Sequence, residues 1–331
     1  MKIDCFTHVM PPKFLQALKQ AINGPFYLEG LLTKTPELSD LDKRLCIMDE
    51  LEVDYQVLTP SSPPIEVLIK DPQKAYDLAR LANDEIAEMA ARHPKRFLPV
   101  GMIAMNNMEK APKEAERAIK DLGMKGLLIY TSADGVPIDD PSFFPFYETM
   151  AKLGYPIWLH PSRGRHVPDY PTETVSKYAI WQIFGWPYET TVAMTRLVFS
   201  GVFDRYPDIA IITHHAGAMV PFLERHIDYM YRLFGDIEGL QENLESLSMP
   251  VLDYFRKFYG DTALNGSVAG LLAAYSFFGH EKLLFGTDSP FDTEGGKSVG
   301  QATIESMNAL PIPPAAKAMM FSGNARRLFH L

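Results

Sequence analysis

Short apolar runs rich in β-branched residues alternate along the chain with longer stretches whose apolar residues recur every three to four positions. The first kind of run is typical of buried strands and the second of amphipathic helices. The predicted strands are residues 2–6, 54–59, 97–104, 125–130, 156–160, 209–214, 257–262 and 282–288. The predicted helices are residues 38–50, 74–92, 109–121, 143–153, 187–204, 217–232 and 266–277. This alternation predicts an α/β fold of the (β/α)8 TIM-barrel kind.

Two segments are longer than the connections of a bare barrel require. Residues 22–37 and residues 161–186 each follow a predicted strand, so we expect them to be inserted loops on the catalytic face. The second loop is rich in aromatic residues and proline, and we expect it to cover the pocket or to form a subunit contact. Residues 299–329 or thereabouts predict C-terminal helices outside the barrel, so that residues 1–331 form a single domain.

A doubly wound open sheet is the alternative architecture. It is disfavoured because no glycine-rich phosphate turn follows the first predicted strand.

Composition and charge narrow the function classes. The chain has 331 residues, of which 47% are hydrophobic, and this is enough for the core of one barrel. The net charge of −9 argues against nucleic acid or an anionic membrane as a partner. The N-terminus does not resemble a secretion signal, and the longest apolar stretch, VAGLLAAYSFFG, is too short to span a bilayer. We therefore expect a cytoplasmic protein without membrane or nucleic-acid partners.

Histidine and aspartate side chains stand where predicted strands end. His8 ends the first strand, His160 the fifth, His214 and His215 the sixth, and Asp288 the eighth. The carboxyl ends of barrel strands meet at one mouth, and neutral imidazole and carboxylate are the usual ligands of zinc and similar ions. One such histidine alone is more often a hydrogen-bonded structural residue. Several at the ends of different strands favour a shared site.

Several stretches resemble a known enzyme superfamily. They are KIDCFTHVMPP at residues 2–12, RLCIMDELEVDYQVLTP at 44–60, HPKRFLPVGMI at 93–103, PIWLHP at 156–161, the long stretch from GWPYET to FLERH at 185–226, LLFGTDSPF at 283–291 and GNARRLF at 323–329. With them the chain resembles the amidohydrolase superfamily, in the branch that holds aminocarboxymuconate-semialdehyde decarboxylase and γ-resorcylate decarboxylase. The resemblance covers nearly the whole chain and implies a metal-dependent hydrolase-like TIM barrel.

The resemblance also implies roles for the residues at the strand ends. His8, His160 and Asp288 match the ligands of one divalent metal ion, with zinc expected and manganese as the alternative. His214 matches the catalytic histidine, with His215 as the second candidate for that role, and Asp288 matches the catalytic aspartate.

One position departs from the family pattern. The first strand usually carries His-x-His, whereas this chain has Phe6-x-His8. Three remaining ligands suffice for one ion with an open position, so we expect a mononuclear site. The alternative is a metal-free pocket in which His8, His160 and His214 bind an anionic substrate directly. A two-metal centre is not expected, because the fourth strand ends in Tyr130 where a bridging lysine often stands.

Arg44 matches an arginine that, in the family, often binds the carboxylate of the substrate. An arginine fork suits a carboxylate. The alternative is that Arg44 pairs with an acidic residue of its own helix, Asp40 or Asp42.

Other residues are weighed as parts of the substrate pocket. Phe6 and His215 are candidates because of their positions at the barrel mouth, and Trp186 could provide an aromatic wall or pack within its own loop. Asp261, at the end of the seventh strand, is expected to cap the following turn.

The resemblance favours a non-oxidative decarboxylase of a small aromatic or unsaturated carboxylic acid. In this hypothesis Asp288, with a raised pKa, protonates the carbon that loses the carboxylate, while His214 orients the substrate or relays the proton. The alternative is a metal-dependent hydrolase or hydratase, in which Asp288 acts as the base and His214 polarises the carbonyl. A non-catalytic binding protein would predict more broken positions than Phe6 alone. The family further implies a homodimer or a homotetramer.

Overall fold

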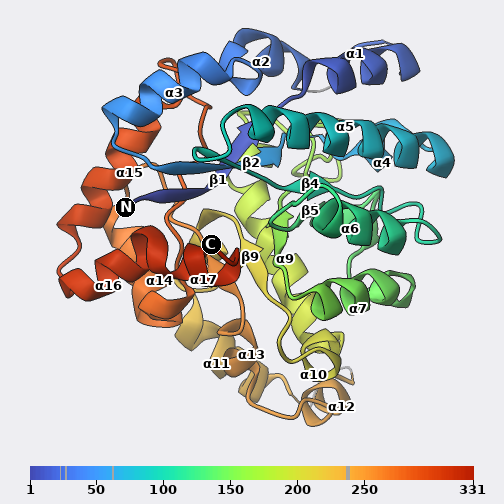
Figure 1. Ribbon diagram of the computed structural model, residues 1–331. Coiled ribbons are helices and arrows are strands. Elements are labelled where there is room, and N and C mark those ends of the chain that lie inside the picture. Colours follow the sequence, from blue (N-terminus) through green and yellow to red (C-terminus); the bar gives the residue numbers. More distant parts are fainter. Residues whose placement is uncertain (23, 27, 62, 236–238) are drawn as a thin grey trace.

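Strands form a closed ring in the computed structural model, which describes residues 1–22, 24–26, 28–61, 63–235 and 239–331 (Figure 1). Neighbouring strands of the ring are parallel. The strands are β1 (Ile3–Val9), β2 (Tyr55–Pro60), β3 (Phe97–Pro99), β4 (Gly101–Met102), β5 (Leu127–Tyr130), β8 (Ile157–His160), β9 (Ile211–Thr213) and β10 (Tyr259–Gly260). A short antiparallel hairpin, β6 (Ser132–Ala133) and β7 (Val136–Pro137), follows β5.

The segment 283–289 closes the ring between β10 and β1. Leu284 N donates to Gly260 O at 2.9 Å, and Cys5 N donates to Phe285 O at 2.8 Å. On the opposite side of the ring, β3 and β4 carry the chain from β2 to β5, as Gly101 N donates to Gly126 O at 3.1 Å. The sheet therefore has no free edge, which confirms the predicted barrel and excludes the open doubly wound sheet.

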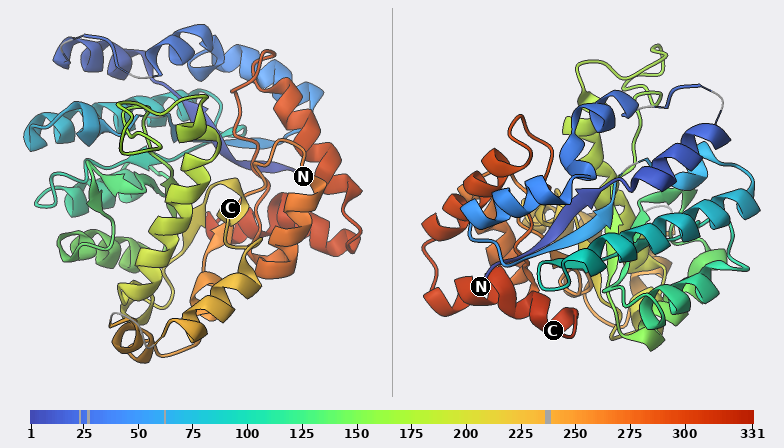
Figure 2. Two further views of the ribbon diagram at one scale, coloured as in Figure 1. Left: turned by 180° about the vertical axis from the view of Figure 1, so that it is seen from behind. Right: turned by 45° about the horizontal axis from the view of Figure 1, so that its top comes forward.

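Helices surround this ring, as the two further views in Figure 2 show. The outer helices are α3 (Leu41–Glu50), α5 (Pro72–Arg92), α6 (Ala111–Lys120), α7 (Phe144–Leu153), α9 (Gly185–Phe199), α10 (Val202–Arg205), α11 (Glu224–Leu233), α13 (Val251–Phe255) and α14 (Val268–Phe278). Asp71 caps α5 by accepting a hydrogen bond from Lys74 N at 2.8 Å, and α7 ends at Gly154, whose φ is +70°. These local signals explain why the predicted boundaries lie close to the observed ones.

Further helices lie in the connections and after the last strand. They are α1 (Pro12–Ala21), α2 (Glu29–Lys34), α4 (Ile65–Leu68), α8 (Ile180–Ile183), α12 (Leu240–Glu245), α15 (Lys297–Ala309), α16 (Pro314–Ala318), α17 (Asn324–Leu328), and the single turns η1 (Pro36–Leu38), η2 (Pro141–Phe143), η3 (His215–Gly217), η4 (His280–Lys282) and η5 (Met319–Gly323). The inserted loop 22–37 thus contains α2, while its residue 23 and residue 27 lie outside the described residues. Helix α1 was not predicted.

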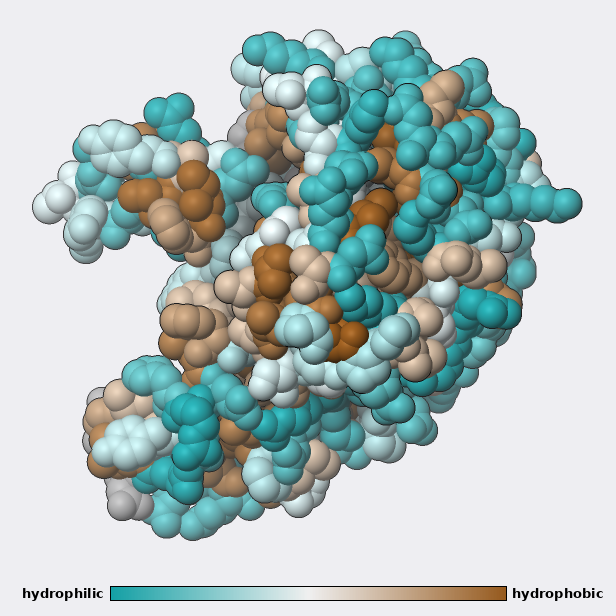
Figure 3. Space-filling model, turned by 90° about the vertical axis from the view of Figure 1, so that its left-hand side faces the viewer, coloured by the Kyte–Doolittle hydropathy of each residue, from teal (hydrophilic) through white to brown (hydrophobic). Residues whose placement is uncertain are grey.

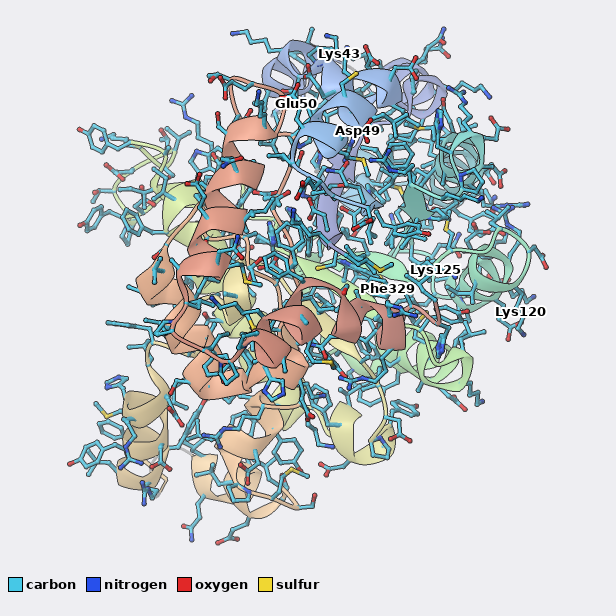
Figure 4. All side chains as sticks on the ribbon, turned by 60° about the vertical axis from the view of Figure 1, so that its left-hand side comes forward. Lys43, Asp49, Glu50, Lys120, Lys125 and Phe329 are labelled. Carbon is cyan, nitrogen blue, oxygen red and sulfur yellow. The ribbon has the colours of Figure 1, made fainter. Side chains whose placement is uncertain are left out.

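The C-terminal residues close one end of the barrel. Phe329 is fully buried and its ring lies 5.3 Å from that of Trp158, whose Nε1 donates to Cys5 O across the barrel at 2.9 Å. Figure 4 shows Phe329 between the last helix and the strands. With this end filled, the mouth at the carboxyl ends of the strands is left for a site.

The face shown in Figure 3 is largely hydrophilic, with hydrophobic residues in separate patches. Among the described residues, no helix is both long and apolar enough to pass through a bilayer.

Candidate active site

His8 lies at the end of β1 with almost no exposed surface. Its Nδ1 lies 3.3 Å from Pro60 O and 3.2 Å from Thr59 Oγ1. These contacts hold the ring so that its other nitrogen, Nε2, lies 3.1 Å from Asp288 Oδ1. The strand end and its neighbour β2 therefore aim this imidazole into the barrel mouth.

His160 ends β8, and His214 follows β9. The two rings lie 5.2 Å apart, and the Nδ1 of His160 contacts Pro161 O at 2.6 Å. Burial, together with the neighbouring His8 and His214, lowers the pKa of His160 well below its usual value. His160 is therefore a neutral imidazole, the form that binds a metal ion.

Asp261 holds His214 in place from β10. His214 Nδ1 contacts Asp261 Oδ2, while Asp261 Oδ1 accepts hydrogen bonds from Ala216 N at 2.9 Å and from Ala263 N at 3.1 Å. Both partners of the ion pair are fully buried. Asp261 thus caps the following turn, as predicted, and in addition fixes the ring of His214, which the sequence did not reveal.

One carboxylate oxygen of Asp288 lies close to two histidine side chains, one at the end of β1 and one after β9. Its Oδ1 lies 3.1 Å from His8 Nε2 and 3.4 Å from His214 Nε2. Asp288 has a positive φ of 65°, and His215 next to His214 has one of 54°. Such backbone conformations are costly for residues other than glycine and concentrate at functional sites.

The charges of this group are tightly coupled. Burial alone would raise the pKa of Asp288, but His214 and His8 hold it well below its usual value. Burial alone would lower the pKa of His214, but Asp261 and Asp288 raise it to about 10. The expected raised pKa of Asp288 does not fit this arrangement, because the effects of His214 and His8 outweigh desolvation. The two directions favour a proton on His214 rather than on Asp288.

Phe6 fills the position of the missing histidine. Its fully buried ring stacks on His214, with centroids 4.1 Å apart and planes inclined by 19°. Phe6 is absent from the described residues that line the two cavities at the mouth. It packs beneath the site rather than against a substrate, which corrects the expected substrate contact.

Two adjoining cavities open at the mouth. The first contains about 430 Å³ of open space, and the second about 990 Å³. Asp288, Trp186, Gln182 and Phe291 line both cavities, whereas His215 lines the second. The indole of Trp186 lies 5.6 Å from His160 and donates from Nε1 to Arg163 O at 2.9 Å. Trp186 and His215 thus border the cavities at the mouth.

Arg44 does not lie in this pocket. It is 2% exposed and donates to Gln56 Oε1 and to Thr7 Oγ1, the latter at 2.6 Å. Neither the predicted carboxylate contact nor pairing with Asp40 or Asp42 fits this placement. The guanidinium instead joins β1 to β2 beneath His8, whose carbonyl oxygen also accepts from Arg44.

Comparison with known proteins identifies the family of this chain. The family model "Amidohydrolase" matches residues 3–331. The chain belongs to the amidohydrolase family.

The most informative relatives are decarboxylases. The chain is 28% identical to 2-amino-3-carboxymuconate-6-semialdehyde decarboxylase of Dictyostelium discoideum, over 98% of this chain and 90% of the relative. It is 30% identical to γ-resorcylate decarboxylase of Rhizobium radiobacter, over 100% and 98%. These matches confirm the branch that the sequence resembled.

A solved structure agrees with the fold. Dihydroxybenzoic acid decarboxylase of Polaromonas sp. JS666, with bound manganese and the inhibitor 2-nitroresorcinol, superposes with a TM-score of 0.81 at 27% identity. The match covers 100% of this chain and 97% of that one.

The side chains of this amidohydrolase site suit a divalent metal ion. Ligand atoms of His8, His160 and His214 lie within 4.8 Å of one another, and those of His214, His215 and Asp288 form a second such group. The buried Nε2 atoms of His8 and His214 have no well-aligned hydrogen bond within the described residues. The Nε2 atom of His8, which faces Asp288 without an aligned hydrogen bond, is placed as a metal ligand is.

Sequence reasoning missed the side chains that wall the pocket. Leu28, Leu31 and Leu32 from the inserted loop 22–37 line the first cavity with Phe291. The position of that loop after β1 signalled its place at the mouth, but not which of its side chains point inward.

Proposed function

We propose that this amidohydrolase is a carboxy-lyase that removes the carboxylate of a small aromatic or unsaturated acid without oxidation. In this proposal His8, His160 and Asp288 hold one divalent ion at the floor of the pocket. One observation carries it: Asp288 Oδ1 lies within 3.4 Å of both His8 Nε2 and His214 Nε2, under walls that are mostly apolar. The decarboxylase activity named for both relatives supports it.

The ion, when bound, supplies positive charge that holds the carboxylate of the substrate and an adjacent oxygen. The residues of the chain supply the proton. Loss of carbon dioxide would leave a negative charge on the ring carbon, so that carbon must be protonated first. His214 Nε2 passes its proton to Asp288, and Asp288 delivers it to the carbon. The bond to the carboxylate then breaks, its electron pair restores the ring, and carbon dioxide leaves.

Asp261 and Phe6 are positioning residues in this scheme. Asp261 accepts from Nδ1 of His214, which keeps Nε2 directed at Asp288. The ring of Phe6 covers one face of His214 and keeps water from it. Because its ring is fixed and shielded from water, His214 transfers its proton to Asp288 alone.

The hydrolase or hydratase alternative, which requires a metal-bound water, has less support, because both relatives compared above are named as decarboxylases. The single-domain organisation, the cytoplasmic location, the homodimer or homotetramer and the preference for zinc over manganese stay predictions.

The test is carbon dioxide release by protein loaded with zinc or with manganese. Asp288→Asn is expected to lower kcat at least about a thousandfold, since it removes both a ligand and the proton carrier. Asp253→Asn changes a largely exposed carboxylate on α13 and is the matched control, with unchanged activity expected. If Asp288→Asn released carbon dioxide as fast as the unmodified protein, the assignment would be wrong.

A further inference from the structure

The two cavities differ in what a substrate would meet away from the floor. The first is walled by the side chains of Leu28, Leu31 and Leu32 together with Trp186 and Phe291. The second adds Asn265 and His215 among further apolar residues. A ligand anchored at Asp288 and the histidines therefore projects its remaining atoms against an apolar wall on the side of α2.

Cationic side chains are missing from these walls. Of the described residues that line either cavity, none is lysine or arginine, and the only basic groups are the imidazoles at the floor. The nearby guanidinium groups line neither cavity: Arg44 donates to Gln56 and Thr7, and Arg163 Nη2 donates to Pro168 O at 3.2 Å, while Arg163 Nε is buried without a hydrogen-bond partner among the described residues. One carboxylate of a substrate would find partners at the floor of the pocket. A second carboxylate would be buried against leucine side chains.

We infer that the substrate is an aromatic monocarboxylic acid whose ring carries an apolar substituent, and that this substituent packs on Leu31 and Leu32. The inference rests on the proposed decarboxylation and narrows it. Burial of an unpaired carboxylate is strongly unfavourable, whereas a methyl group gains from leaving water. A dicarboxylic acid is therefore excluded by the same wall that favours an alkyl group.

Gln182 adds a polar contact between the two cavities. It lines both, and its side-chain amide forms no hydrogen bond with another described residue. The amide can donate to and accept from a ring hydroxyl. A hydroxyl group on the substrate's ring could therefore form a hydrogen bond with Gln182. The alkyl substituent needs no such partner.

The experiment compares kcat/KM across a panel with the metal-loaded enzyme. The panel is 2-hydroxybenzoate, its derivatives with a methyl group at each remaining ring position, and the same derivatives with carboxylate in place of methyl. We expect at least one methyl derivative to exceed the parent about tenfold. Every dicarboxylate is expected to fall at least about a hundredfold below its methyl counterpart, because its second charge finds no partner.

Variants of the wall connect this preference to α2. Leu32→Ala, and separately the more exposed Leu31→Ala, are expected to lower about tenfold the ratio of kcat/KM for the methyl derivative to kcat/KM for the parent acid. Leu272→Ala, on α14 and outside both cavities, is the matched control and should leave the preference unchanged. Leu31→Arg is expected to raise kcat/KM for a dicarboxylate about tenfold by pairing its second charge.

The outcomes distinguish a failure of the proposed decarboxylation from a failure of the inference about the substrate's substituent. Failure of every acid to release carbon dioxide would overturn the proposed function itself. Release from dicarboxylates as fast as from methyl derivatives, or an equal loss for parent and methyl derivative in both leucine variants, would overturn only the inference about the wall.

Discussion

At the scale of single residues, the proposed proton transfer depends on the contact between Asp261 and His214. Asp261→Asn keeps an oxygen for Ala216 N and Ala263 N but places an amide against Nδ1 of His214. The imidazole must then accept at Nδ1 and carries its only proton on Nε2, so it would become an imidazolate if it gave that proton to Asp288. We expect kcat to fall about a hundredfold with KM within about twofold. Steady-state kinetics check this, with Asp253→Asn as the control. A large rise in KM at constant kcat would contradict the positioning role.

Phe6 sets how firmly the site holds its ion. A histidine at this position would add a fourth imidazole beside His8, His160 and His214, where the ring of Phe6 now stacks. We expect Phe6→His to tighten zinc or manganese binding about tenfold or more. Competition of the apo protein with a fluorescent chelator measures this. Phe222→His adds a histidine on the surface, where the native side chain is 84% exposed, and should leave the affinity unchanged. Equal affinities in the two variants would show that Phe6 does not occupy a ligand position.

At the scale of elements, the C-terminal helix contributes to stability by closing the barrel. Phe329 fills the space beneath Trp158. Phe329→Ala would leave a cavity there and is expected to lower the free energy of unfolding by about 3–5 kcal/mol. Urea denaturation checks this, with Phe222→Ala as an exposed control that should change it by less than about 0.5 kcal/mol. A loss as small as that of the control would mean that the last helix is not part of the core.

The elements also show where sequence reasoning succeeds. Buried parallel strands are continuous apolar runs, so β2 and β8 could be placed, and the residues that end them followed from the barrel. The direction of a loop side chain has no such period, and so Leu31 and Leu32 were missed. Arg44 was misjudged for a related reason. Its position in the sequence is compatible both with binding a substrate and with joining β1 to β2. Only the packing in the structure distinguishes the two roles.

At the scale of the whole molecule, stability depends on pH through Asp4. Burial raises the pKa of Asp4 to about 7, against the opposing effects of Thr287 and Arg44. The folded protein therefore binds this proton where the unfolded chain, with an ordinary pKa, has lost it. The stabilisation is complete below about pH 4 and is lost as the pH rises to about 7.

Asp4→Asn is neutral at every pH and should flatten this dependence. Its free energy of unfolding is expected to lose about 4 kcal/mol less than that of the unmodified protein between pH 4 and pH 8. Denaturant titrations at several pH values check this, and Asp253→Asn should follow the unmodified protein. Parallel curves for Asp4→Asn and the unmodified protein would contradict a protonated Asp4.

The reaction itself is tested most directly by running it in heavy water and examining the product by nuclear magnetic resonance. If Asp288 protonates the carbon that loses the carboxylate, each product molecule carries one deuterium at the vacated position, together with one equivalent of carbon dioxide. A product that retains its carboxylate and has gained the elements of water would contradict the account.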